Sequence, residues 1–164
     1  MEIILGNIVA LIASILMVYV GVIKEKKRIL YVQTIQIILS TASNIILGGI
    51  TGAIINLLGC IRNILCYYNK LEVKEKVILI FLSVALSLIF NNMGFIGLLP
   101  IFSIITYTVF IDINDVVKFK ILIILSLIAW FVYDLYIKSY VAALFDFVSI
   151  LANIISIVDI QRRK

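Results

Sequence analysis

An arginine and several amides lie within stretches of sequence that are otherwise apolar enough to cross a bilayer. Arg62 and Asn63 stand in the run GAIINLLGCIRNILC, which begins at Gly52. A charged side chain inside a membrane helix costs a few kcal/mol, so it is expected to face the bundle interior or a wet cavity. A guanidinium and amides in such a place offer binding of a polar solute through charge and hydrogen bonds.

The same spacing of polar and small residues recurs 90 residues further along the chain, where Asp146 matches Asn56 and Asn153 matches Asn63. In both copies the spacing is i, i+4, i+7, i+11, i+14, which is one face of a helix. We expect both faces to line one central site. The two stripes are Gly52, Asn56, Gly59, Asn63 and Cys66, and Ala142, Asp146, Ser149, Asn153 and Ser156.

The composition indicates a polytopic membrane protein. Of the 164 residues, 64% are hydrophobic, and the mean hydropathy is +1.24. A soluble domain of this size has too little interior to bury that much apolar surface. The chain has no histidine, and it shows no catalytic triad, phosphate loop or metal-ligand cluster. We therefore expect no enzyme activity, no cofactor or metal, and no nucleic-acid partner. The expected partners are the lipid bilayer and a small polar solute, and the sequence is compatible with a homo-oligomer.

Seven apolar segments predict seven transmembrane helices. They cover residues 3–23, 29–47, 53–68, 77–90, 95–111, 117–137 and 140–160. A six-span alternative omits the weakest segment, 77–90. Apart from Arg62 and Lys138, however, every lysine and arginine lies in the first, third or fifth polar break, at residues 24–28, 69–76 and 112–120, or in the tail. Only seven spans place all of these on one side, and the positive-inside rule then predicts an outer N-terminus and a cytoplasmic C-terminus.

The repeat and the topology together predict an all-α membrane protein made of two parallel three-helix-bundle repeats. A first unit (residues 1–69) and a second unit (residues 94–164) are joined by a linker that contains the fourth helix (residues 70–93). One intervening helix restores the orientation of the chain, so both units cross the membrane in the same sense. Transporters built from repeats bind substrate near the midplane, between the units.

Each candidate site residue also has a plainer structural interpretation. Amides and small residues serve as hydrogen-bonding and packing groups between membrane helices. Arg62 has the reach to snorkel to the headgroups, although an internal role with Asp134 or Asp146 as partner is preferred. Trp130 is predicted to form an aromatic wall, and Pro100 a kink or hinge within the segment 95–111. The predicted substrate-binding residues are Asn63, Asn153, Arg62, Asp146, Trp130, Asn56 and Gln36.

Short motifs in several spans carry a family resemblance. They are Ala53-Ile54-Ile55-Asn56, Ile61-Arg62-Asn63, Leu98-Leu99-Pro100, Trp130, and Ser149 with Asn153. In these motifs the chain resembles the YgjV family of bacterial inner-membrane proteins over nearly its whole length. The resemblance implies relation to the SWEET, PQ-loop and Pnu-type transporter group, whose sugar facilitators place an asparagine on the third helix of each unit, as Asn63 and Asn153 would be. The Pro-Gln pair of the PQ-loop pattern is absent, and Pro100 has only Ala10 as its counterpart.

The sequence therefore predicts a transporter or facilitator of a small polar metabolite in the bacterial inner membrane. It would work by alternating access around a midplane site between the two three-helix units. The alternative is a non-transporting receptor, or a binding or assembly protein, that uses the same cavity.

Overall fold

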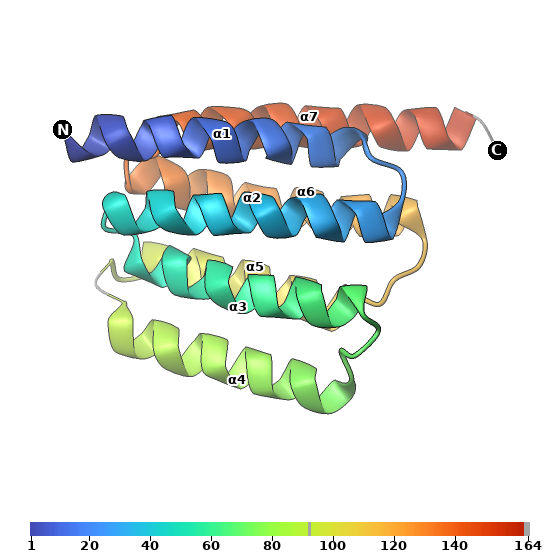
Figure 1. The fold of residues 1–164 in the computed structure, drawn as a ribbon, viewed down its shortest axis with the longest axis horizontal. Helices are drawn as coiled ribbons and strands as arrows, with labels where there is room; N and C mark the ends of the chain where they lie inside the picture. Colours follow the sequence, from blue (N-terminus) through green and yellow to red (C-terminus); the bar gives the residue numbers. More distant parts are fainter. Residues whose placement is uncertain (92, 163–164) are drawn as a thin grey trace.

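The computed structural model describes residues 1–91 and 93–162, which form seven α-helices and one short 3₁₀ helix (Figure 1). The all-α prediction is confirmed. In chain order the elements are α1 (Glu2–Val22), α2 (Lys26–Ile46), α3 (Ile50–Tyr67), α4 (Val73–Phe90), η1 (Ile96–Leu98), α5 (Leu99–Phe110), α6 (Val116–Tyr136) and α7 (Tyr140–Arg162).

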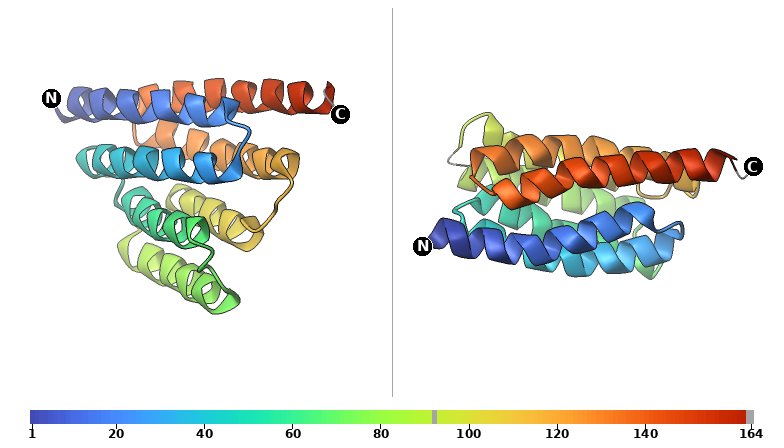
Figure 2. Two further views of the ribbon diagram at one scale, coloured as in Figure 1. Left: turned by 45° about the vertical axis from the view of Figure 1, so that its right-hand side comes forward. Right: turned by 90° about the horizontal axis from the view of Figure 1, so that it is seen from above.

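Six of the helices form two layers of three. In one layer α2 packs between α1 and α3, and in the other α6 packs between α5 and α7. The layers meet where α1 lies against α7 and where α3 lies against α5 (Figures 1 and 2). Helix α4 lies outside this arrangement, against α3 and α5. The middle helices α2 and α6 are therefore flanked on both sides by cross-layer contacts.

The helix ends recur at the same offset as the polar stripes. Helices α2 and α6 each have 21 residues and begin and end 90 residues apart, and α3 and α7 also begin 90 residues apart. The turns that follow α2 and α6 match as well, because Gly48 and Lys138 both have a positive φ, of 76° and 62°. In the first turn the Gly49 N–H donates to the carbonyl of Asn44 at 2.8 Å. In the second turn the Ser139 N–H donates to the carbonyl of Asp134 at 2.9 Å. Both helices thus end with a left-handed residue that closes the last turn.

Five of the seven helices are long and apolar enough to cross a membrane, namely α1, α2, α3, α6 and α7. Helix α4 begins at Val73, before the predicted segment, so its first turn includes Lys74, Glu75 and Lys76. The apolar helix Ile96–Phe110, made of η1 and α5, is shorter than a typical span. The structure therefore has the predicted number of helices, but only five of them have the length and composition of a membrane span.

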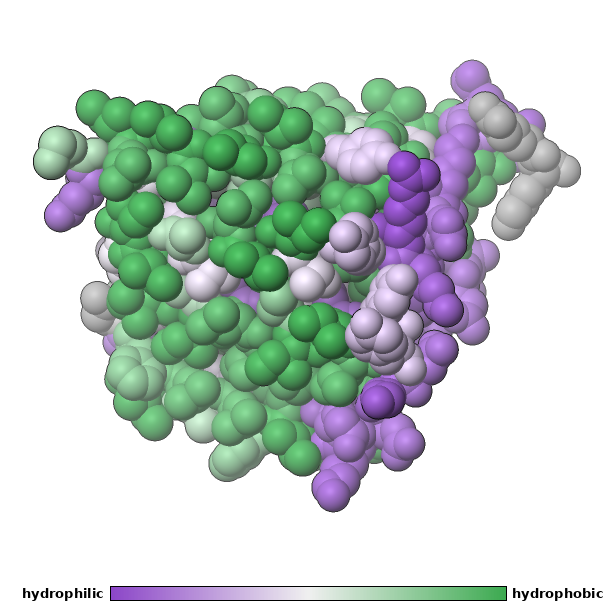
Figure 3. Space-filling model, viewed as in Figure 1, coloured by the Kyte–Doolittle hydropathy of each residue, from purple (hydrophilic) through white to green (hydrophobic). Residues whose placement is uncertain are grey.

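Charged side chains gather at one end of the helix bundle. The α1–α2, α3–α4 and α5–α6 connections and the end of α7 all lie at this end (Figure 1). The space-filling view shows hydrophilic residues concentrated there and a broad hydrophobic surface elsewhere (Figure 3). Large apolar side chains such as Phe81, Phe102 and Leu144 are exposed on the helix sides. This distribution is that of a bundle whose sides contact lipid and whose charged end contacts water.

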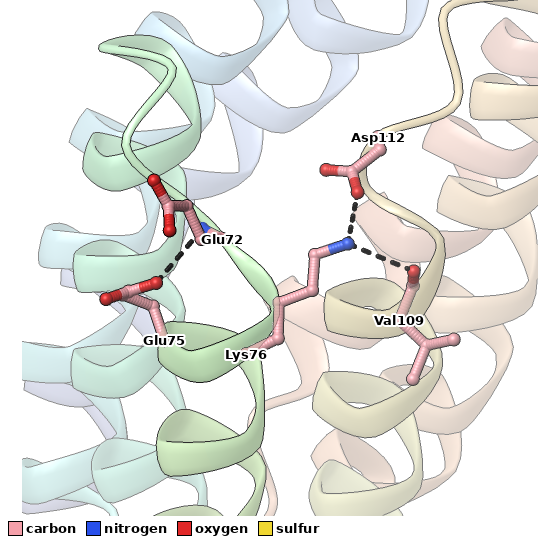
Figure 4. Close-up of polar contacts among 5 residues, drawn as sticks. All are labelled: Glu72, Glu75, Lys76, Val109 and Asp112. Carbon is pink, nitrogen blue, oxygen red and sulfur yellow. Dashed lines mark hydrogen bonds and ion pairs between the residues drawn. The ribbon is translucent and has the colours of Figure 1, made fainter.

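An ion pair connects α4 to the segment that follows α5, at the charged end of the bundle. Lys76 pairs with Asp112, and its Nζ also donates to the carbonyl of Val109 at 3.5 Å (Figure 4). At the start of α4, the Glu72 N–H donates to the Glu75 side chain at 3.2 Å, as part of a capping box. Asp112 is exposed, and exposed ion pairs contribute at most about 1 kcal/mol. The apolar contacts of α4 with α3 and α5 therefore contribute more to its position.

Pro100 lies in the first turn of α5, directly after η1. A proline there removes no intrahelical hydrogen bond, because the first N–H groups of a helix have no acceptor within the helix. The segment changes from a 3₁₀ helix to an α-helix at this point. The kink or hinge predicted at Pro100 stays a prediction.

Candidate functional site

A polar cavity lies between the two helix layers. Residues of α1, α2, α3, α5, α6 and α7 line it, and no described residue of α4 does. The residues that line it include Ser14, Ser40, Ser103 and Ser126, which carry hydroxyl groups. Its volume is about 80 Å³, which is room for several water molecules at ~10–15 Å³ each. In residues 1–91 and 93–162, no group of three or more histidine, cysteine or carboxylate side chains is placed to hold a metal ion.

Five of the seven predicted substrate-binding residues line this cavity: Arg62, Asp146, Trp130, Asn56 and Gln36. The other two, Asn63 and Asn153, are fully buried outside its wall. The two asparagines therefore do not face each other across the cavity. Each of them instead accepts a hydrogen bond from a buried cation.

Arg62 is only 4% exposed. Its Nε and Nη2 donate to Oδ1 of Asn63 at 3.1 and 2.8 Å, and its Cζ lies 4.2 Å from the ring centroid of Tyr107. A cation over an aromatic face gains about 0.5–2 kcal/mol, but the ring carries no net charge. Among the described residues no carboxylate pairs with Arg62, so the predicted partners Asp134 and Asp146 do not fill that role.

Gln33, which is not among the predicted binding residues, connects the groups around Arg62. Its Oε1 accepts hydrogen bonds from Asn63 Nδ2 at 3.3 Å and from the Tyr107 hydroxyl at 3.0 Å. Gln33 of α2, Asn63 of α3 and Tyr107 of α5 thus form a connected group of side chains that supports the Arg62 guanidinium. A side chain supported in this way loses little further freedom when it binds a ligand.

The second buried cation is Lys120, which the sequence predicts to lie in a cytoplasmic connection. Lys120 lies instead in the second turn of α6 and is 0% exposed. Its Nζ donates to the carbonyl of Gly21 at 2.7 Å and to Oδ1 of Asn153 at 3.5 Å. The sequence does contain a signal for the burial of Lys120. An apolar run from Phe119 to Leu125 surrounds it, which indicates a position within a helix and not before one.

Close packing explains why the second copy of the repeat has no arginine at the position of Arg62. Arg62 corresponds to Ala152, and α1 passes Ala152 at Gly21. A Cβ added to Gly21 would lie 2.9 Å from the Ala152 Cβ, so no long side chain fits between these helices. Lys120 of α6 supplies the cation that Asn153 accepts from, where Arg62 of α3 does so for Asn63.

The two carboxyl groups of the cavity lie away from Arg62, toward the turns that join α2 to α3 and α6 to α7. Asp134 and Asp146 are both buried, and both line the cavity. Among residues 1–91 and 93–162, Oδ2 of Asp146 and Nδ2 of Asn56 have no hydrogen-bond partner. Asn56 precedes Arg62 by six residues on α3, a rise of about 9 Å. The cavity therefore has an acidic end and a basic end.

Comparison with known proteins agrees with this membrane architecture. Residues 4–164 match the family model Imp-YgjV, described as a bacterial inner membrane protein. No curated protein and no solved structure matches the chain. Because the match covers nearly the full length, the chain belongs to the Imp-YgjV family of bacterial inner membrane proteins.

Proposed function

We propose that this protein is a transporter or facilitator that moves a small polar metabolite across the bacterial inner membrane. The observation that supports this proposal is the polar cavity, to which six helices from both layers contribute and in which Arg62 has no described carboxylate partner. Buried ionisable groups are expensive in a membrane protein and mark solute or ion pathways.

In this proposal two three-helix units, residues 1–69 and 94–164, rock against each other around the cavity, with residues 70–93 as the linker. The matching helix ends of α2 and α6 and the equivalent α1–α7 and α3–α5 contacts support such a pair of units. Opening the α2–α3 and α6–α7 side exposes the acidic end of the cavity, and opening the other side exposes the basic end. Repeat-built transporters alternate access to a central site in this way.

The proposed orientation places the charged end of the bundle, with the C-terminus, in the cytoplasm. Lysines and arginines are enriched on the cytoplasmic side of membrane proteins, and this end carries the connections richest in them. A C-terminal reporter that is active only in the cytoplasm tests the orientation. Activity of a periplasm-specific reporter at the same position would contradict it.

Uptake by proteoliposomes tests the transport function. The protein is reconstituted, and radiolabelled amino acids, organic acids, sugars and nucleosides are offered in turn. We expect uptake of at least one solute above empty liposomes, and loss of that uptake in Gln36→Leu, because Gln36 lines the cavity. Thr34→Val is the matched control, since Thr34 is on the same helix but outside the cavity wall. No uptake across the panel, or equal uptake by both variants, would reject the proposal.

The small cavity favours a second candidate, a receptor or assembly protein that does not transport. A volume of about 80 Å³ is well below the ~300–1,000 Å³ of ordinary small-molecule sites. Stable capture of a partner protein in mild detergent, together with no thermal shift from any solute in the panel, would support this candidate over the transporter.

A further inference from the structure

No described carboxylate neutralises the charge of Arg62, although its side chain lines the cavity and is almost completely buried. In the part of the chain that the structure describes, its partners are the neutral Asn63 amide and the Tyr107 ring. A buried cation without an anion bears a desolvation cost that is normally offset by a paired charge. A negatively charged group of a ligand would supply that pair.

The hydrogen bonds of Arg62 leave one edge of the guanidinium available. Nε and Nη2 both donate to the same acceptor, Asn63 Oδ1, which occupies the Nε side of the group. No described residue accepts a hydrogen bond from Nη1. Nη1 and the second N–H of Nη2 therefore form a free fork of two donors. Such a fork matches the two oxygens of a carboxylate.

The space beside the guanidinium is also suitable for a small group. Gly59, one turn before Arg62 on α3, lines the cavity, and a Cβ added to it would lie 3.7 Å from Arg62 Nη2. The absence of a side chain at Gly59 thus leaves the edge of the guanidinium uncovered. Lys120, the other buried cation, is not on the cavity wall and is already held by a carbonyl and an amide.

From these observations we propose that Arg62 binds the carboxylate group of a small organic acid or amino acid, through the free Nη1–Nη2 edge, at the basic end of the cavity. The site deepens the proposed function, because it names the chemical class of the solute. The cavity volume of about 80 Å³ suits a short acid.

The single tryptophan of the chain provides a direct binding signal. Trp130 lines the same cavity, so its fluorescence reports on occupancy. The purified protein in detergent is titrated with sodium acetate and sodium propionate at constant ionic strength, and with the neutral isosteres acetamide and propionamide. We expect a saturable change with the carboxylates and at least about a tenfold weaker response to the amides, because the amides lack the charge that strengthens the fork hydrogen bonds.

Variants separate the site from the fold. Arg62→Gln should abolish the response to carboxylate, and Arg62→Lys should weaken it about tenfold, since a lysine offers a point charge without the fork. Arg28→Gln is the matched control, because Arg28 is exposed but also stacks on a tyrosine, at 5.7 Å from its ring centroid. Gly59→Ala keeps the charge and narrows the site, and it should also weaken binding. It carries the test if Arg62→Gln does not fold.

Three results would overturn the proposal: equal responses to carboxylates and amides, a response that persists unchanged in Arg62→Gln and Gly59→Ala, or Arg62-dependent binding of inorganic phosphate but not of carboxylates. The test does not depend on transport. Carboxylate binding without uptake into proteoliposomes keeps this site and rejects the transporter. Uptake that is insensitive to Arg62→Gln, with no carboxylate binding, keeps the transporter and rejects the site.

Discussion

Replacement of Tyr133 by phenylalanine tests how the two helix layers are joined. Tyr133 of α6 is 0% exposed, and its hydroxyl oxygen accepts a hydrogen bond from the Gly52 N–H of α3 at 3.0 Å. Gly52 lies in the first turn of α3, where N–H groups have no acceptor within the helix, and the N-cap residue Gly49 provides no side-chain cap. A side chain from the opposite layer therefore caps α3.

The expected cost follows from what Tyr133→Phe leaves behind. The variant keeps the ring but removes the acceptor that the described residues provide for the buried Gly52 N–H. An unpaired buried donor costs about 1–3 kcal/mol. Relief by a water molecule is prevented by close packing, because a Cβ added to Gly52 would lie 2.7 Å from the Tyr133 ring. We expect the full cost to appear in the free energy of unfolding.

Unfolding by sodium dodecyl sulfate in mixed micelles, followed by circular dichroism, measures this cost. Tyr136→Phe is the matched control, since Tyr136 is on the same helix and is exposed, and a surface change of this kind alters stability by less than about 0.5 kcal/mol. Equal stability of Tyr133→Phe and Tyr136→Phe would refute the argument that Tyr133 caps α3.

Three further changes test other contacts by the same measurement. Gly21→Ala should destabilise the protein by about 1–3 kcal/mol through overpacking, because the new methyl group would meet the Ala152 Cβ at 2.9 Å; an unchanged midpoint would show that α1 and α7 can separate freely. Gly48→Ala should cost about 1–2 kcal/mol from backbone conformation alone, since φ is +76° and no atom lies within 4 Å of the added Cβ; Gly48→Asn should cost less, and the reverse order would contradict this explanation. Lys76→Met should lower the free energy of unfolding by less than about 1 kcal/mol, because its partner Asp112 is exposed. The difference in stability between this variant and the unmodified protein should vanish in 1 M salt, where the Debye length falls to about 3 Å.

Local patterns in the sequence were sufficient to predict the helices and the buried face of α3 and α7. Asn56, Gly59 and Asp146 are buried, as the stripe spacing requires, and three of their neighbours on the cavity wall were also predicted. This works because a helix fixes the angular position of each residue independently of its neighbours in space. Pro100 shows the limit of such patterns, since its effect depends on where the helix begins, and helix ends are poorly marked inside apolar sequence.

The sequence by itself determined the all-α fold, the membrane environment and the concentration of cations at one end, because composition and hydropathy depend only on residue types. Only the tertiary structure decided the fate of each buried charge. Arg62 stacks on Tyr107 of α5 and has no described carboxylate partner, whereas Lys120 is held by Gly21 of α1 and Asn153 of α7. These partners come from helices distant in sequence. The close approach of α1 to α7 leaves room only for Ala152 at the position on α7 that corresponds to Arg62 on α3. Charge pairing in a bundle follows from which helices are neighbours, and no local pattern of residues encodes that.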